Sequence, residues 1–103
     1  TTAQSYQAYR DTLITAVTEV ENALGQERTL AQQQQHIETA LERQQNNLTQ
    51  YQQRYRNGTA TVLELLIVQQ QTYNLEAQLD TIIYNRLANR VVLGLALGLG
   101  ADQ

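Results

Sequence analysis

The side chains best suited to chemistry lie in the middle of the first half of the sequence. His36 is the only histidine, and Glu38 and Glu42 follow it with the spacing of one helical turn. A bound metal needs several ligands, and His36 is accompanied by no second histidine and no cysteine. Ser5, the only serine, is remote from His36, so no nucleophile is paired with a base. We therefore predict no catalytic residue, no metal and no cofactor, and we expect the chain not to be an enzyme.

Composition indicates helices rather than a compact mixed core. The 103 residues suffice for one domain, but they include no Pro, Cys, Met, Trp or Phe, and Gln is abundant. The net charge of −3 disfavours nucleic acid and anionic lipid as partners, because both are bound by basic surfaces. The longest apolar run, residues 91–101, is shorter than the roughly 20 residues of a membrane-spanning helix. We expect a soluble chain, or one cut from something larger.

The first half of the sequence carries a heptad repeat that predicts a long helix over residues 3–56. Steps of three and four place apolar side chains on one stripe, as in a left-handed coiled coil. This stripe, here called the first seam, comprises Tyr6, Tyr9, Leu13, Ala16, Val20, Ala23, Glu27, Leu30, Gln34, Ile37, Leu41, Gln44, Leu48, Tyr51 and Tyr55. No segment alternates with a period of two, so no strand is predicted.

A stop signal and a start signal follow one another within a few residues. Gly58 can take the left-handed conformation that ends a helix, and Asn57 suits the same turn. Thr61 and Glu64 have the spacing of a capping box, in which the Thr61 hydroxyl accepts from the Glu64 amide and the Glu64 carboxylate returns to the Thr61 amide. We predict a turn at 57–60 and a second helix over about 61–97, running antiparallel to the first.

The second half carries two apolar stripes, of which one helix can cover only one. One stripe comprises Leu65, Val68, Thr72, Leu75, Leu79, Ile82, Arg86, Asn89 and Leu93; the other comprises Leu66, Tyr73, Ala77, Tyr84, Ala88 and Val91. The sequence does not say which stripe faces the first helix, and the other one needs a further partner. Gly94, Gly98 and Gly100 lower helix propensity and are expected to end the element.

Three polar residues, Glu27, Gln34 and Gln44, interrupt the first seam, and two interpretations remain open. Polar seam residues fix register and oligomeric state in coiled coils. Alternatively, this seam faces water, as in a helical tunnel.

Short motifs elsewhere in the sequence are weak evidence of function. Gly94 and Gly98 have the spacing of membrane helix packing in too short a run, and Asn47 and Asn57 match a glycosylation pattern that arises readily by chance.

The turn is the candidate functional site. Apolar side chains beside a hairpin tip indicate a partner, although Val62 and Leu63 could instead staple the turn. The candidate docking residues are Tyr55, Arg56, Gly58, Thr59, Thr61, Val62, Leu63 and Glu64.

Three segments, in order, resemble the TolC-like family of outer-membrane efflux proteins. Residues 54–66 (RYRNGTATVLELL) resemble its Tyr-x-x-Gly turn, followed by Thr, an aliphatic pair, an acid and a Leu-rich helix. Residues 16–24 (AVTEVENAL) resemble its A-x-x-E-V-E-x-A-L stretch, and residues 93–100 resemble its Leu- and Gly-rich end. The resemblance extends over nearly the whole chain and identifies it with the helical hairpin of the second repeat.

The resemblance implies a function in transport. Such proteins are homotrimers whose helices form a periplasmic tunnel, an α-helical barrel, below an outer-membrane part. Hairpin tips close the tunnel and meet a periplasmic adaptor tied to an inner-membrane pump. Gly58 then corresponds to the turn glycine, residues 59–63 to the docking tip and Glu64 to the family's acid, whereas Ile67 stands where a second acid is common. The resemblance makes this chain a periplasmic segment of the channel, lacking the family's strands and first repeat.

The alternative is a structural coiled-coil interaction module, such as the hairpin of a periplasmic adaptor. Adaptor tips favour a pattern of Arg, Leu and Ser, which does not occur near Gly58.

Overall fold

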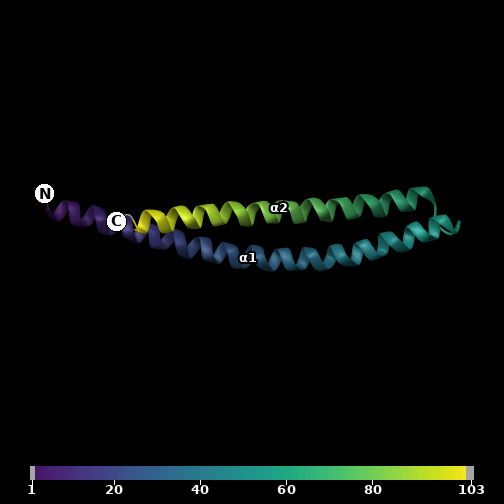
Figure 1. Ribbon diagram of the computed structural model, residues 1–103, viewed down its shortest axis with the longest axis horizontal. Coiled ribbons are helices and arrows are strands. Elements are labelled where there is room, and N and C mark those ends of the chain that lie inside the picture. The colour runs from purple at the N-terminus through teal and green to yellow at the C-terminus, as the bar shows by residue number, and fades with distance from the viewer. Residues whose placement is uncertain (1, 102–103) are drawn as a thin grey trace. The chain divides into compact units, whose positions relative to one another are not determined.

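The computed structural model describes residues 2–101, which form two α-helices and no strand (Figure 1). Helix α1 spans Thr2–Arg56 and helix α2 spans Val62–Ala101. The predicted all-α hairpin is therefore confirmed. Helix α2 does not end near residue 97: Gly94 and Gly98 lie inside it. Each glycine costs a helix about 1 kcal/mol relative to alanine, and packing opposes that cost here because Ala96, between them, is only 1% exposed.

Helix α1 ends in a Schellman motif at Gly58, the glycine that was predicted to end the helix. Gly58 has a φ of 76°, and no described residue other than glycine has a positive φ. The Gly58 amide donates to the Tyr55 carbonyl at 3.1 Å, and the Thr59 amide donates to the Arg54 carbonyl at 2.8 Å. These two bonds satisfy carbonyls that the helix end would leave without partners.

The start of α2 is capped by Thr61. Its Oγ1 accepts a hydrogen bond from the Glu64 amide at 3.1 Å, and its carbonyl accepts from the Leu65 amide at 3.1 Å. The first half of the predicted capping box is confirmed, and helix α2 begins one residue later than expected because Thr61 is the cap itself. The return bond from the Glu64 carboxylate stays a prediction.

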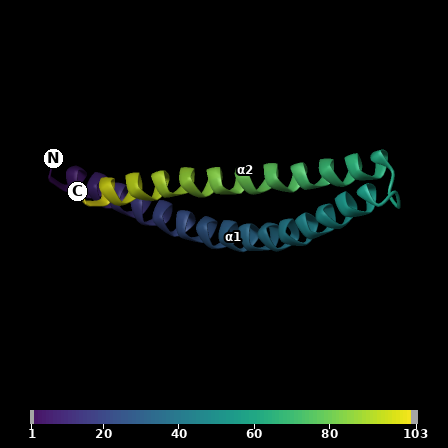
Figure 2. The ribbon, with the colours of Figure 1, turned by 45° about the vertical axis from the view of Figure 1, so that its right-hand side comes forward.

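The chain divides into two compact units, each made of one segment of α1 and one of α2. Unit 1 is built from residues 2–31 and 84–101, and unit 2 from residues 32–83, including the turn. Within each unit the two segments run antiparallel and side by side, as Figure 1 and Figure 2 both show. Unit 2 has the tight turn at one end, where the teal ribbon reverses direction.

The first seam lies between the helices in both units. Its members from Ala16 to Tyr51 are all buried or half-buried, whereas Tyr6, Tyr9 and Leu13 at its start and Tyr55 at its end are exposed. In unit 1 the first turns of α1 extend past the described end of α2 (Figure 1). Tyr6 and Tyr9, near the start of α1, are exposed.

Helix α2 turns one of its two apolar stripes, the one from Leu65 to Leu93, towards α1, and this stripe is here called the inner stripe. Every member of the inner stripe is buried or half-buried, and every member of the other stripe, from Leu66 to Val91 and here called the outer stripe, is exposed. The buried apolar side chains are few: Ala16, Ala23 and Ala96 in unit 1, and Leu41, Ala60, Val68 and Ile82 in unit 2. None of the large described side chains is completely enclosed. The hairpin thus buries one stripe of each helix and leaves much apolar surface in contact with water.

Gly58 and Gly25 allow one substitution to be tested in two backbone conformations. A Cβ at either position would meet nothing within 4 Å, so space does not distinguish them. We expect Gly58→Ala to destabilise the hairpin by about 1 kcal/mol, because alanine is strained at positive φ. Gly25→Ala, inside α1, is expected to stabilise it by up to about 1 kcal/mol. Urea unfolding followed by circular dichroism measures both, and equal effects of the same sign would contradict the role assigned to φ.

Candidate functional site

The structure brings the predicted docking residues together on the surface of the turn. Tyr55, Arg56, Gly58, Thr59, Thr61, Val62, Leu63 and Glu64 are all exposed, at the end of α1 and the start of α2 in unit 2. Sequence reasoning missed Ala60, which is buried in the middle of the turn. The burial of Ala60 could have been predicted because it is a small apolar residue among polar turn residues.

The start of α2 presents an apolar patch, here called the tip patch and consisting of Val62, Leu63, Leu66 and Ile67. These side chains are 54%, 65%, 54% and 50% exposed, respectively. Val62 and Leu63 therefore do not close over the turn as a staple. Leu66 and Ile67 join them because residues four apart share one side of a helix. That spacing could have found both, but the sequence analysis placed Leu66 only in the outer stripe.

Hydrogen bonds hold the backbone beneath the tip patch. Arg54 donates from Nη2 to the Thr59 carbonyl at 3.4 Å, and the Thr59 hydroxyl donates to the Arg54 carbonyl at 3.1 Å. The Arg54 guanidinium also lies over the Tyr51 ring, 5.0 Å from its centre. The sequence analysis included Arg54 only as the first residue of the segment that resembles the TolC-like turn. Arg54 lies three residues before Asn57, the C-cap of α1, where a Schellman motif places an accepting carbonyl. That position could have predicted its contacts with the turn.

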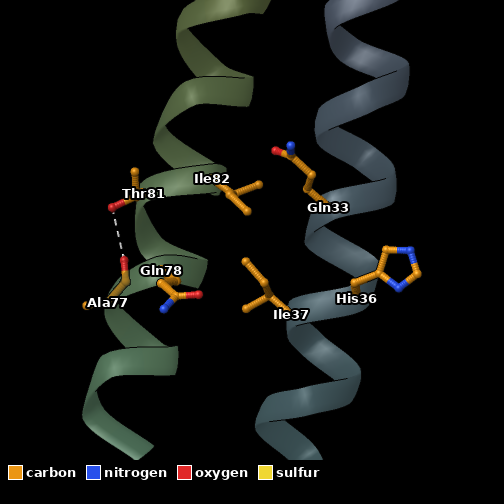
Figure 3. Close-up of a pocket in the computed structure, with 7 residues that line it drawn as sticks. All are labelled: Gln33, His36, Ile37, Ala77, Gln78, Thr81 and Ile82. Carbon is orange, nitrogen blue, oxygen red and sulfur yellow. Dashed lines mark hydrogen bonds between the residues drawn. The ribbon is translucent and has the colours of Figure 1, made fainter. Parts of the chain in front are cut away.

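His36 borders an open groove of about 540 Å³ in unit 2 but is not directed into it. Ile37 and Ile82 point towards one another between the helices, while the His36 ring points away from α2 (Figure 3). Of the two acids near His36, Glu38 accepts a hydrogen bond from Gln34 on its own helix at 2.8 Å. Residues 2–101 contain no group of three side chains placed to bind a metal ion.

The polar members of the first seam reach across to α2 or along α1. In unit 1, Glu27 accepts from Arg86 Nε at 3.0 Å and also from Arg86 Nη2. In unit 2, Gln44 donates to the Val68 carbonyl at 3.4 Å and to Gln71 at 3.2 Å. Glu27 and Gln44 therefore contact the partner helix of the same chain, which favours the register interpretation over a water-facing seam.

Arg86 determines the electrostatics of Glu27. Its hydrogen bond is the largest influence and holds the pKa of the Glu27 carboxyl below the ordinary value of 4.5. Desolvation opposes this by raising the pKa, and the charges of Arg86 and Arg90 lower it further. The Glu27 carboxylate is therefore ionised in the folded hairpin at neutral pH.

Two further findings concern membrane-spanning helices and similarity to known proteins. Within the described residues, neither helix has a stretch both long and apolar enough to cross a membrane. No protein-family model, curated protein or solved structure gives a significant match to this chain.

Acid is expected to weaken the hairpin through Glu27. Since its folded pKa lies below 4.5, the contribution of Glu27 to stability is present above that value and is lost as the pH falls through the folded pKa. We expect Glu27→Gln to reduce the difference between the urea midpoints measured at about pH 7 and about pH 3. Glu21→Gln, at an exposed position of the same helix, is the matched control. An unchanged pH dependence in Glu27→Gln would contradict the assignment.

Proposed function

We propose that this chain is a periplasmic helical hairpin of a TolC-like outer-membrane efflux channel, and that its tip docks a periplasmic adaptor. The observation that carries the proposal is the tip patch. Four apolar side chains, each at least half exposed, stand on a turn whose backbone is fixed by a Schellman motif and an N-cap. Clusters of exposed apolar side chains on a rigid element are typical of protein interaction sites.

The outer stripe of α2 supports the proposed place of the hairpin in a tunnel wall. Tyr73 and Tyr84 are 67% and 70% exposed, in unit 2 and unit 1 respectively. A two-helix hairpin offers nothing to cover them, whereas neighbouring helices of a homotrimer would. Transport then belongs to the assembled channel in the outer membrane, and the inner-membrane pump is reached only through the adaptor.

The proposed mechanism is mechanical: adaptor contact at the tip separates helices there and opens the tunnel. A docked partner can move a helix end only through backbone that resists local unfolding, and the two caps provide that resistance. Selection of cations by paired acids is not part of the proposal, because Ile67 occupies the second acidic position of the family.

Photo-crosslinking in cells tests docking directly. A crosslinker at Thr59 or Val62 of the full-length protein is expected to capture a periplasmic adaptor, because both positions are exposed at the tip. The same crosslinker at Arg43, exposed on α1 away from the turn, is the control and is expected to capture no adaptor. Capture of trimer neighbours alone at Thr59 and Val62 would remove docking from the tip. A partner from another compartment would overturn the efflux assignment.

Leu63→Gln separates docking from folding. Leu63 is 65% exposed, so the free energy of unfolding of the isolated chain should change by less than about 0.5 kcal/mol. Adaptor capture and efflux by the full-length protein should fall. Leu24→Gln makes the same change at a half-exposed position in unit 1 and should leave adaptor capture intact. Normal efflux and capture with Leu63→Gln would contradict the proposal.

A further inference from the structure

In the described part of unit 1, polar contacts join α1 and α2. The Glu27 carboxylate accepts from the Arg86 guanidinium, and the Asn89 side-chain amide donates to the Ala23 carbonyl at 2.7 Å. These two contacts lie one helical turn apart on each helix. The Glu27 and Arg86 side chains are 27% and 24% exposed, so the ion pair lies within the seam and not on the open surface.

The ion pair is poorly suited to adding net stability. Two opposite charges moved out of water lose hydration, and their attraction offsets this loss only when every polar atom finds a partner. Glu27 Oε2 is buried and has no hydrogen-bond partner among the described residues. Apolar pairs of similar size are often at least as stable as such ion pairs. The pair therefore calls for a different physical explanation.

The apolar part of the seam does not define a unique pairing of the helices. Unit 1 lies far along the chain from the turn, and a distortion of one helix between the turn and unit 1, equivalent to an insertion of residues, would change the pairing in unit 1. A shift of one heptad would set Glu27 against Leu79 or Leu93 of the inner stripe. Arg86 would then face Val20 or Gln34 of the first seam. In either direction, a half-buried charge would lose its partner, whereas one aliphatic or alanine contact would simply replace another.

We infer that Glu27 and Arg86 act as a register lock, which selects one pairing of α1 and α2 in unit 1 and adds little net stability. Single polar seam residues have this effect in coiled coils, where they determine register at a cost in stability. The inference is independent of the proposed function, since it concerns only the pairing of two helices of one chain. Asn89 adds to the lock by binding a backbone carbonyl that moves with Ala23.

Distance measurements between spin labels test the lock. The chain has no cysteine, so cysteines introduced at Gln26 and Asn85 are the only labelled positions. Both positions are exposed and border the same groove of unit 1. In the otherwise unchanged chain we expect one narrow distance distribution. In E27L/R86L we expect more than one distance population, with a thermal midpoint no lower than that of the parent. The single variants E27L and R86L should have lower midpoints, because each removes one charge of the ion pair and leaves the opposite charge in the seam.

The controls keep the inference open to refutation. E21L/R28L makes the same chemical change at exposed positions of α1 and should keep the single distribution. The exchanged pair E27R/R86E retains one charge on each helix and should also keep it, even if E27L/R86L fails to fold. The inference is overturned by a single narrow distribution in E27L/R86L, by a midpoint of that variant as low as those of the single variants, or by several populations in E27R/R86E.

Discussion

A pair of helices can bury one stripe of each partner and no more, and the rest of this structure depends on that constraint. The first seam and the inner stripe of α2 cover one another, and their buried apolar side chains are few: Ala16, Ala23 and Leu41 in the first seam, and Val68 and Ile82 in the inner stripe. Several large apolar side chains elsewhere in the described residues, such as Leu24 and Leu87, are at least half exposed. The exposed outer stripe is therefore a direct consequence of hairpin geometry, and it is the physical reason to expect further helices around this chain.

The paired helices are stabilised by burial of apolar side chains, whereas the turn is stabilised mainly by backbone hydrogen bonds. Gly58 and Thr61 cap two helix ends separated by only a few residues, and Ala60 alone is enclosed between them. Such a turn can keep Val62 and Leu63 in water without losing its conformation. A surface that is rigid before binding loses little entropy on binding, which favours the tip as an interaction site.

Much of the candidate site followed from sequence because its interactions are local. The bonds that define the turn join residues three to five positions apart, and such spacing is legible in the order of Gly, Thr and Glu. Ala60 was missed because its burial depends on how two helices converge on it. The continuation of α2 through Gly94 and Gly98 was missed for a related reason: packing of Ala96 opposes a local propensity that favours ending the helix.

Two long helices, a tight turn and the first seam could be predicted from the order of the residues, because helix periodicity and capping are properties of neighbouring residues. The stripe of α2 that faces α1, and the contact of Glu27 with Arg86, depend on how the two helices pack. Both stripes of α2 have helical spacing, so periodicity cannot distinguish them. The choice depends on the rotation of one helix about its axis relative to the other, which is set jointly by the turn and by contacts between residues far apart in the chain.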